Sequence, residues 1–189
     1  MITTRRFTSA DLEAFPDDGN RYEIIEGELY VSKAPHFSHQ DVCTRIAIAL
    51  NRWSDRTGNG RAIFAPGLIF SDDNDVVPDI VWIGSARLAS ALRPDGHLHA
   101  APELIVEVLS PGSASEKRDR EAKRGLYSRR GVDEYWIVDW RRGTIDVFRR
   151  SGPDLLHTAT LTASGVLESP LLPGLSLPVA PLFEGLLEG

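Results

Sequence analysis

The sequence contains a single cysteine, Cys43, so no disulfide can form within the chain. This scarcity fits a reducing compartment. No apolar run approaches the roughly 18 residues that a membrane-spanning helix needs, and the first residues show no signal-peptide core. We therefore expect a soluble, cytoplasmic protein without a membrane partner.

The chain also lacks an excess of positive charge. It has 21 Lys and Arg against 27 Asp and Glu, a net charge of −6, whereas a dedicated nucleic-acid binder is usually basic. The positive residues are nevertheless concentrated, because eleven of them lie between Lys117 and Arg150 and none follows Arg150. This segment is either a solvated helix face followed by a turn or a surface that faces phosphates, and composition leaves both open.

The length of 189 residues, with 42% hydrophobic residues, suits one domain over residues 1–189 with a single core. Residue patterns predict an early β-hairpin at 21–33, helices at 36–53, at 84–92 and from Ser113 or Ser115 to Arg130, and a short helix at the C-terminus. The middle of the chain runs strand, helix, strand. We therefore predict an α/β (α+β) fold in which helices flank a central mixed sheet.

The stretch "PELIVEVLSPGS" places one acid, Glu107, inside an apolar run. Such a run is typical of a strand that is covered on both faces. An ionised carboxylate there costs several kcal/mol unless it is compensated. Protonation, a partner cation from another element or a metal ion would each compensate it.

Asp79 has a similar setting in "VVPDIVWI". Pro78 cannot donate a ladder hydrogen bond, so we expect the strand to begin near it and Asp79 to lie at the strand end. Two carboxylates on adjacent strands repel one another, and a hard divalent cation would resolve this repulsion. Mg²⁺ prefers one or two carboxylates, a carbonyl and several waters.

Lys123 is the third candidate, because a helical wheel of about 100° per residue places it on the core-facing side of the helix. Its neighbours on that arc are Asp119, Leu126 and Tyr127, whereas Arg118 and Arg124 fall outside it. The helix follows the strand of Glu107 directly. We therefore expect it to pack on that strand and bring the lysine near the carboxylates.

An Asp on one strand, a Glu on the next and a Lys near both can perform metal-assisted phosphodiester hydrolysis. The carboxylates hold the ion, the ion polarises a phosphate oxygen and activates a water, and the lysine orients the nucleophile or stabilises developing charge. The same spacing also fits an ordinary structural Glu–Lys pair beside a strand-end Asp. The residues alone leave both interpretations open.

Five segments carry a resemblance to a known family: "RYEIIEGELYV", "HQDV", "VVPDIVWI", "APELIVEVLSP" and "RDREAKRGLYSRRGVDEYWIVD". They resemble the Uma2-like family of endonucleases, within the PD-(D/E)xK, or restriction-endonuclease-like, superfamily. The match extends from about Thr8 to Leu177. It implies a restriction-endonuclease-like central mixed sheet.

The resemblance also assigns roles to residues. It implies that Asp79 and Glu107 bind Mg²⁺, for which Mn²⁺ can substitute, together with the backbone carbonyl of Val108. The lysine that usually stands two residues after the glutamate is absent, because Leu109 is there, and the resemblance implies that Lys123 serves instead. It makes Glu23, in the hairpin, a further acidic site residue.

The residues around these acids suggest a DNA partner. Arg118, Arg120 and Arg124 are candidates for contacts with flanking phosphates, and His39 either contacts a phosphate or serves a structural role at its helix N-terminus. We expect a Mg²⁺-dependent DNA endonuclease that forms a homodimer, since a duplex has two strands to cut. The alternatives are a weakly active or inactive binding or assembly module on a nuclease-like scaffold and a hydrolase of smaller phosphate esters.

Overall fold

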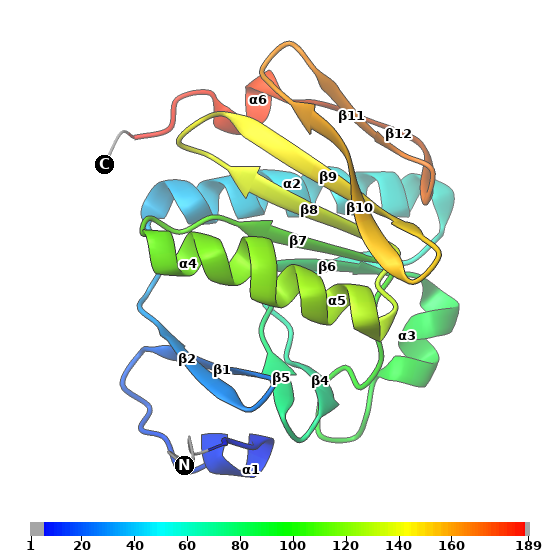
Figure 1. Cartoon of the computed structure of the whole chain (residues 1–189). Helices are drawn as coiled ribbons and strands as arrows, with labels where there is room; N and C mark the ends of the chain where they lie inside the picture. The colour runs from blue at the N-terminus through cyan, green and yellow to red at the C-terminus, as the bar shows by residue number, and fades with distance from the viewer. Residues whose placement is uncertain (1–5, 188–189) are drawn as a thin grey trace.

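The structure is a computed structural model, and it describes residues 6–187. A six-stranded sheet lies in the middle of the molecule (Figure 1). The helix α2 (Phe37–Thr57) covers one face of this sheet, and a helix that begins with α4 (Ser113–Lys117) covers the other (Figure 1). The arrangement confirms the predicted mixed α+β class with helices flanking a central sheet.

The strands of the central sheet follow the order β10-β9-β8-β7-β6-β3. Their bounds are β3 Arg61–Phe64, β6 Ile80–Ile83, β7 Leu104–Val108, β8 Glu134–Asp139, β9 Thr144–Ser151 and β10 Asp154–Leu161. Only β7 and β8 pair in parallel, and all other neighbours are antiparallel. A parallel pair needs a crossover, and the helix between β7 and β8 provides it, as the strand–helix–strand pattern predicted.

Side-chain alternation along β7 divides the core into two parts. Leu104, Val106 and Val108 pack in the cluster under α2, whereas Ile105 and Leu109 pack in the cluster on the opposite face. Glu107 therefore points to the same face as Ile105 and Leu109, because alternate residues of a strand share a face. This is the face covered by the crossover helix.

A second sheet, with the order β2-β1-β5-β4, lies below the central sheet in the view of Figure 1. Its bounds are β1 Arg21–Ile25, β2 Glu28–Ser32, β4 Leu68–Ser71 and β5 Asn74–Val76, with α1 (Ser9–Leu12) nearby. The predicted hairpin is β1–β2, and its two-residue turn at Glu26 and Gly27 has positive φ at both positions (52° and 75°). Such turns match the twist of paired strands.

The crossover helix is a continuous run with an irregular middle. It consists of α4, the π-helical segment η1 (Arg118–Lys123) and α5 (Arg124–Arg130), and it ends at Gly131 with φ of 89°. The predicted helix up to Arg130 is thus confirmed, but its N-cap is Gly112 rather than Ser113 or Ser115. A π-turn holds more residues than an α-turn, so the wheel used for the prediction does not apply across η1.

The C-terminal part of the chain lies on the α2 side of the central sheet. The hairpin of β11 (Val166–Ser169) and β12 (Leu172–Pro178) adds Leu167, Leu172 and Leu177 to the core under α2. The predicted C-terminal helix is short, since α6 covers Ala180–Phe183 only. Like α6, α3 (Ser85–Ala91) was expected from sequence. Among residues 6–187, no helix is long and apolar enough to cross a membrane.

The turn after α2 offers a test of how closely this helix meets the sheet. Gly58 and Gly60 both have positive φ, but a Cβ at Gly58 would meet nothing within 4 Å, whereas one at Gly60 would lie 2.5 Å from the carbonyl oxygen of Ile83. Gly58→Ala should lower the free energy of unfolding by about 1–2 kcal/mol through backbone strain alone. Gly60→Ala should lower it distinctly more. Urea unfolding of both variants measures the difference, and equal losses would contradict the close contact.

Candidate active site

Glu107 is a buried acid with two donors on one oxygen. Its side chain is 2% exposed. Lys123 Nζ lies 2.9 Å from Glu107 Oε1, and the Tyr127 hydroxyl donates to the same oxygen at 2.8 Å. Both donors come from the crossover helix, which covers the face of β7 to which Glu107 points. The cost of burying the Glu107 carboxylate is therefore compensated by a partner cation and a hydroxyl donor.

Lys123 joins three acids inside the protein. Its side chain is fully buried, and Nζ lies 2.8 Å from Glu23 Oε1, 2.9 Å from Glu107 Oε1 and 4.0 Å from Asp119 Oδ1. Burial opposes the charged form of the lysine, but Glu107 and the other acids outweigh it and raise the pKa of Lys123. Lys123 is therefore an ammonium group at neutral pH.

Asp79 lies directly opposite Glu107 in the sheet. Ile80 pairs with Val106 in the antiparallel β6–β7 ladder, so the next position along each strand brings the two acids side by side. Asp79 Oδ2 accepts from the backbone N–H of Val108 at 2.9 Å and lies 3.2 Å from His39 Nε2. The other oxygen, Oδ1, accepts from Arg21 at 3.2 Å.

Glu23 reaches the cluster from the hairpin. Its Oε1 accepts from Lys123 and from the backbone N–H of Val77 at 2.9 Å. Its Oε2 is buried without a hydrogen bond, and its cation partner is Arg118, whose nitrogen lies 3.7 Å away. Glu23 therefore shares Lys123 with Glu107.

The orientation expected for Arg118 was wrong. The wheel placed it on the outer side of the helix, but its side chain is only 10% exposed and bonds Asp119 at 2.9 Å and the Ser32 hydroxyl at 2.6 Å. The cause is the π-turn, which widens the arc that faces the sheet, so that Arg118, Asp119 and Lys123 all point inward.

The other predicted phosphate contacts are also engaged within the protein. Arg120 pairs with Asp146 at 2.7 Å, and the Arg124 guanidinium lies 5.2 Å from the centre of the Phe148 ring. His39 is 3% exposed and lies 3.2 Å from Asp79, whereas His36 is the N-cap of α2.

The charges of this cluster almost cancel. The buried carboxylates belong to Glu23, Asp79, Glu107 and Asp119, and the permanent cations are Arg21, Arg118 and Lys123. With all four carboxylates ionised, the cluster has a net charge of −1. One additional proton therefore makes the metal-free cluster neutral. Glu107, His39 and Asp119 are candidates to carry this proton, because the pKa of each is raised.

The pKa shifts agree with this balance. Burial is the main cause that raises the pKa of Glu107 to about 8, against the attraction of Lys123, and the charge of Asp79 adds to the increase. For Asp79, burial would raise the pKa, but the hydrogen bond from His39 and the nearby cations hold it well below its usual value. For His39, burial lowers the pKa, and Asp79 outweighs it, so the pKa of His39 is raised.

The residues that line a small cavity of about 20 Å³ include Asp79, Glu107 and Val108, and also the cationic residues Arg21, Lys33 and Arg118. This is room for one water molecule or an ion of similar size. Carboxylate and backbone oxygens are the ligands that a hard cation such as Mg²⁺ prefers. The residues present therefore fit a small divalent ion, which would replace the extra proton as the source of positive charge.

A second group of metal-ligating atoms is less suitable. His39, Cys43 and Asp79 have ligand atoms within 4.8 Å of one another. However, burial strongly raises the pKa of the Cys43 thiol, and a metal binds the thiolate rather than the thiol. The cavity beside Asp79 and Glu107 is therefore the better candidate for a metal site.

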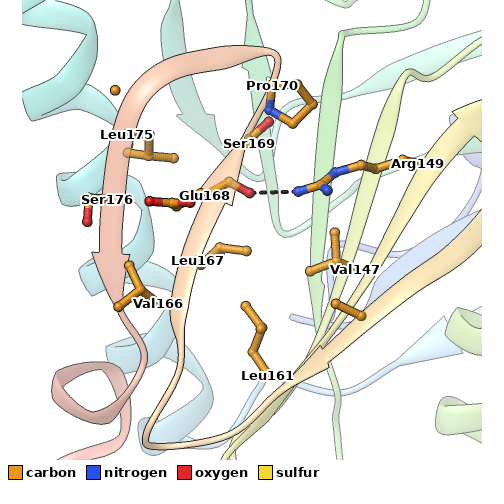
Figure 2. Close-up of a pocket in the computed structure, with 12 residues that line it drawn as sticks. Val147, Arg149, Leu161, Val166, Leu167, Glu168, Ser169, Pro170, Leu175 and Ser176 are labelled. Atoms are coloured by element: carbon orange, nitrogen blue, oxygen red, sulfur yellow. Dashed lines mark hydrogen bonds between the residues drawn. The ribbon is translucent and has the colours of Figure 1, made fainter.

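A larger pocket lies elsewhere, between the β9–β10 strands and the β11–β12 hairpin (Figure 2). It has a volume of about 550 Å³ and a mixed lining that includes aliphatic residues such as Leu161 and Val166 and polar residues such as Arg149 and Ser169. Arg149 bridges it by donating to the Glu168 carbonyl at 2.7 Å (Figure 2). None of its lining residues belongs to the acid–lysine cluster, so pocket size does not locate the candidate site.

Two contributors were not found from the sequence. Arg21 lies two residues before Glu23 on one face of β1, and this alternation was a usable signal. Tyr127 was placed on the core-facing arc but without a role. The structure does bring Asp79, Glu107, Val108, Lys123 and Glu23 together, as expected.

Comparisons with known proteins identify the family of this chain and a solved structure with the same fold. Residues 9–180 match the model of the Uma2 family, described as "Putative restriction endonuclease". The match covers most of the chain, so the protein belongs to the Uma2 family. No curated protein matches it significantly.

A solved structure supports the fold. It is described as "a putative nuclease belonging to DUF820" from Anabaena variabilis, and it superposes with a TM-score of 0.75 at 20% sequence identity. The alignment covers 96% of this chain and 99% of the other. At this identity the likeness concerns the fold.

The shared proton predicts how stability depends on pH in chelator-treated protein. Glu107 has a folded pKa above its ordinary 4.5, so between about pH 5 and 8 the folded state binds more protons than the unfolded state. The free energy of unfolding should therefore fall as pH rises through this window. The pKa of His39 is also raised above its ordinary 6.5, so His39 likewise lowers the free energy of unfolding as pH rises above that value.

Glu107→Gln should flatten this decline and leave the smaller part due to the other groups with raised pKa values, His39 and Asp119. Urea unfolding at several pH values measures the slope, and Glu168→Gln, at an exposed position, controls for the loss of one carboxylate. A slope unchanged in Glu107→Gln would contradict the assignment of the proton.

Proposed function

We propose that this protein is an endonuclease that hydrolyses phosphodiester bonds of DNA with Mg²⁺, or with Mn²⁺ as a substitute. The observation that carries the proposal is the pair Asp79 and Glu107, which lie side by side and both line a cavity of about 20 Å³, with the buried Lys123 bonded to Glu107. Membership of a family of nucleases supports the reaction class.

Asp79, Glu107 and the backbone carbonyl of Val108 would hold the ion. When bound, it polarises a phosphate oxygen and lowers the pKa of a bound water. The protein fixes the ligands: the Val108 N–H and His39 hold Asp79 Oδ2, and Lys123 and Tyr127 both hold Glu107 Oε1. Both hydrogen bonds use Oε1, so neither of them occupies Glu107 Oε2.

Lys123 contributes a fixed positive charge. It is buried and held by Glu107 and Glu23, so it orients the Glu107 carboxylate and adds positive potential where negative charge develops on the phosphate. Such preorganised charge stabilises a transition state because it needs no reorganisation during the reaction. In this proposal Glu23 positions the lysine.

The test is cleavage of supercoiled plasmid DNA with Mg²⁺, with Mn²⁺ and with chelator. We expect metal-dependent nicking that falls about 100-fold or more in Asp79→Asn, Glu107→Gln and Lys123→Met, since loss of one electrostatic contributor has effects on this scale. Glu103→Gln is the matched control, because Glu103 lies just before β7 and contacts Gly84 and Arg87 rather than the cluster.

Folding of each variant is checked by circular dichroism, because removal of Lys123 leaves buried carboxylates unpaired. Cleavage that depends on metal but is unchanged in Glu107→Gln would contradict the proposal.

One observation favours a second candidate, a weakly DNA-binding or assembly module with little turnover, because paired arginines and a negative net charge oppose tight binding of a DNA substrate. Arg118 and Arg120, expected on a phosphate-facing surface, are paired with Asp119 and Asp146, and the net charge is −6. Salt-dependent DNA affinity without cleavage would support this alternative. The expected homodimer and cytoplasmic location stay predictions.

A further inference from the structure

Arg21 is the cation of the cluster that reaches solvent. It lies on β1, and one of its terminal nitrogens is 3.2 Å from Asp79 Oδ1 and 3.2 Å from the Val77 carbonyl oxygen. Its side chain is 27% exposed, against 1% for Lys123 and 10% for Arg118. It also lines the cavity formed by Asp79 and Glu107. Arg21 therefore contacts both solvent and the cavity formed by Asp79 and Glu107.

Both oxygens of Asp79 have partners in this structure. Oδ2 is held by the Val108 N–H and His39, and Oδ1 is held by Arg21. The Val108 N–H and His39 cannot readily move away from Oδ2, because the first is backbone within β7 and the second is a buried ring on α2. Arg21 has a long, partly exposed side chain. A cation that binds Asp79 through Oδ1 would thus displace Arg21.

We propose that Arg21 is an exchangeable counter-ion of Asp79: it occupies Oδ1 in the metal-free protein, a divalent ion takes that oxygen, and the released guanidinium binds a phosphate of the DNA. This inference rests on the proposed function. A guanidinium suits the second role, because its planar donors match phosphate oxygens.

The exchange couples the two ligands. A phosphate that binds Arg21 removes the competitor from Asp79, and an ion on Asp79 makes Arg21 available to the phosphate. Each ligand must then raise the affinity of the other by the same factor, because linkage is reciprocal. A cation with no contact to Asp79 would not produce this effect.

The first experiment titrates Mn²⁺ into the full chain by calorimetry, without DNA. Arg21→Met should bind Mn²⁺ more tightly than the unmodified protein, on the order of tenfold (about 1.4 kcal/mol). Arg21→Gln, which can keep a donor for the Val77 carbonyl, should do the same and serves if the Met variant does not fold.

Two controls separate competition from a general charge effect. Lys33→Met removes a cation that lines the same cavity and should change the affinity much less. Arg87→Met removes an arginine that pairs with Glu103 and Asp133 on another part of the surface and should leave it unchanged.

The second experiment repeats the titration with a short DNA duplex present. The duplex should raise the Mn²⁺ affinity of the unmodified protein severalfold but have little effect in Arg21→Met. Equal or weaker Mn²⁺ binding by both Arg21 variants, a shift of the same size in Lys33→Met, or coupling that persists in Arg21→Met would each overturn the inference.

The outcomes also distinguish this inference from the proposed function. If the protein binds Mn²⁺, Asp79→Asn abolishes the binding, and the Arg21 variants bind no more tightly, then only the role of Arg21 is overturned. If neither the unmodified protein nor the Arg21 variants bind Mn²⁺, the metal site and the proposed function fail together with it.

Discussion

The desolvation of Glu107 is the constraint on which the rest of the site depends. A carboxylate on the covered face of β7 must be paired, and Lys123 and Tyr127 supply the pairing from the crossover helix. Lys123 is itself buried, so it requires further acids, which Glu23 and Asp119 provide. The hairpin, the sheet and the helix are thus joined by ionic contacts as well as by apolar packing.

The sequence predicted those features that follow from regular periodicity. Glu107 and Asp79 were identifiable because each is a lone acid in an apolar strand, and Lys123 because it shares an arc with Leu126 and Tyr127. The inward turn of Arg118 was not predictable from a wheel, since it depends on the π-segment η1. The approach of Arg21 to Asp79 joins residues 58 positions apart, and no local pattern encodes that tertiary contact.

The ion pairs of the basic segment show that its arginines are not all free to bind phosphates. Arginines that look like a basic surface in the sequence are neutralised by Asp119 and Asp146, and the central cluster carries no surplus of cations. Under the proposed function, the attraction of a polyanion to this site would depend on the bound metal ion and on Arg21 more than on a basic surface.

The position of the amine on a helix has a further consequence for the length of the chain. Leu109, two residues after Glu107, is fully buried in the core beneath the crossover helix. Because the amine reaches Glu107 from a position sixteen residues away, the strand end is available for hydrophobic packing. Insertions or deletions between Gly112 and Lys123 would rotate the amine away from its acids, so the site constrains the number of residues in this interval.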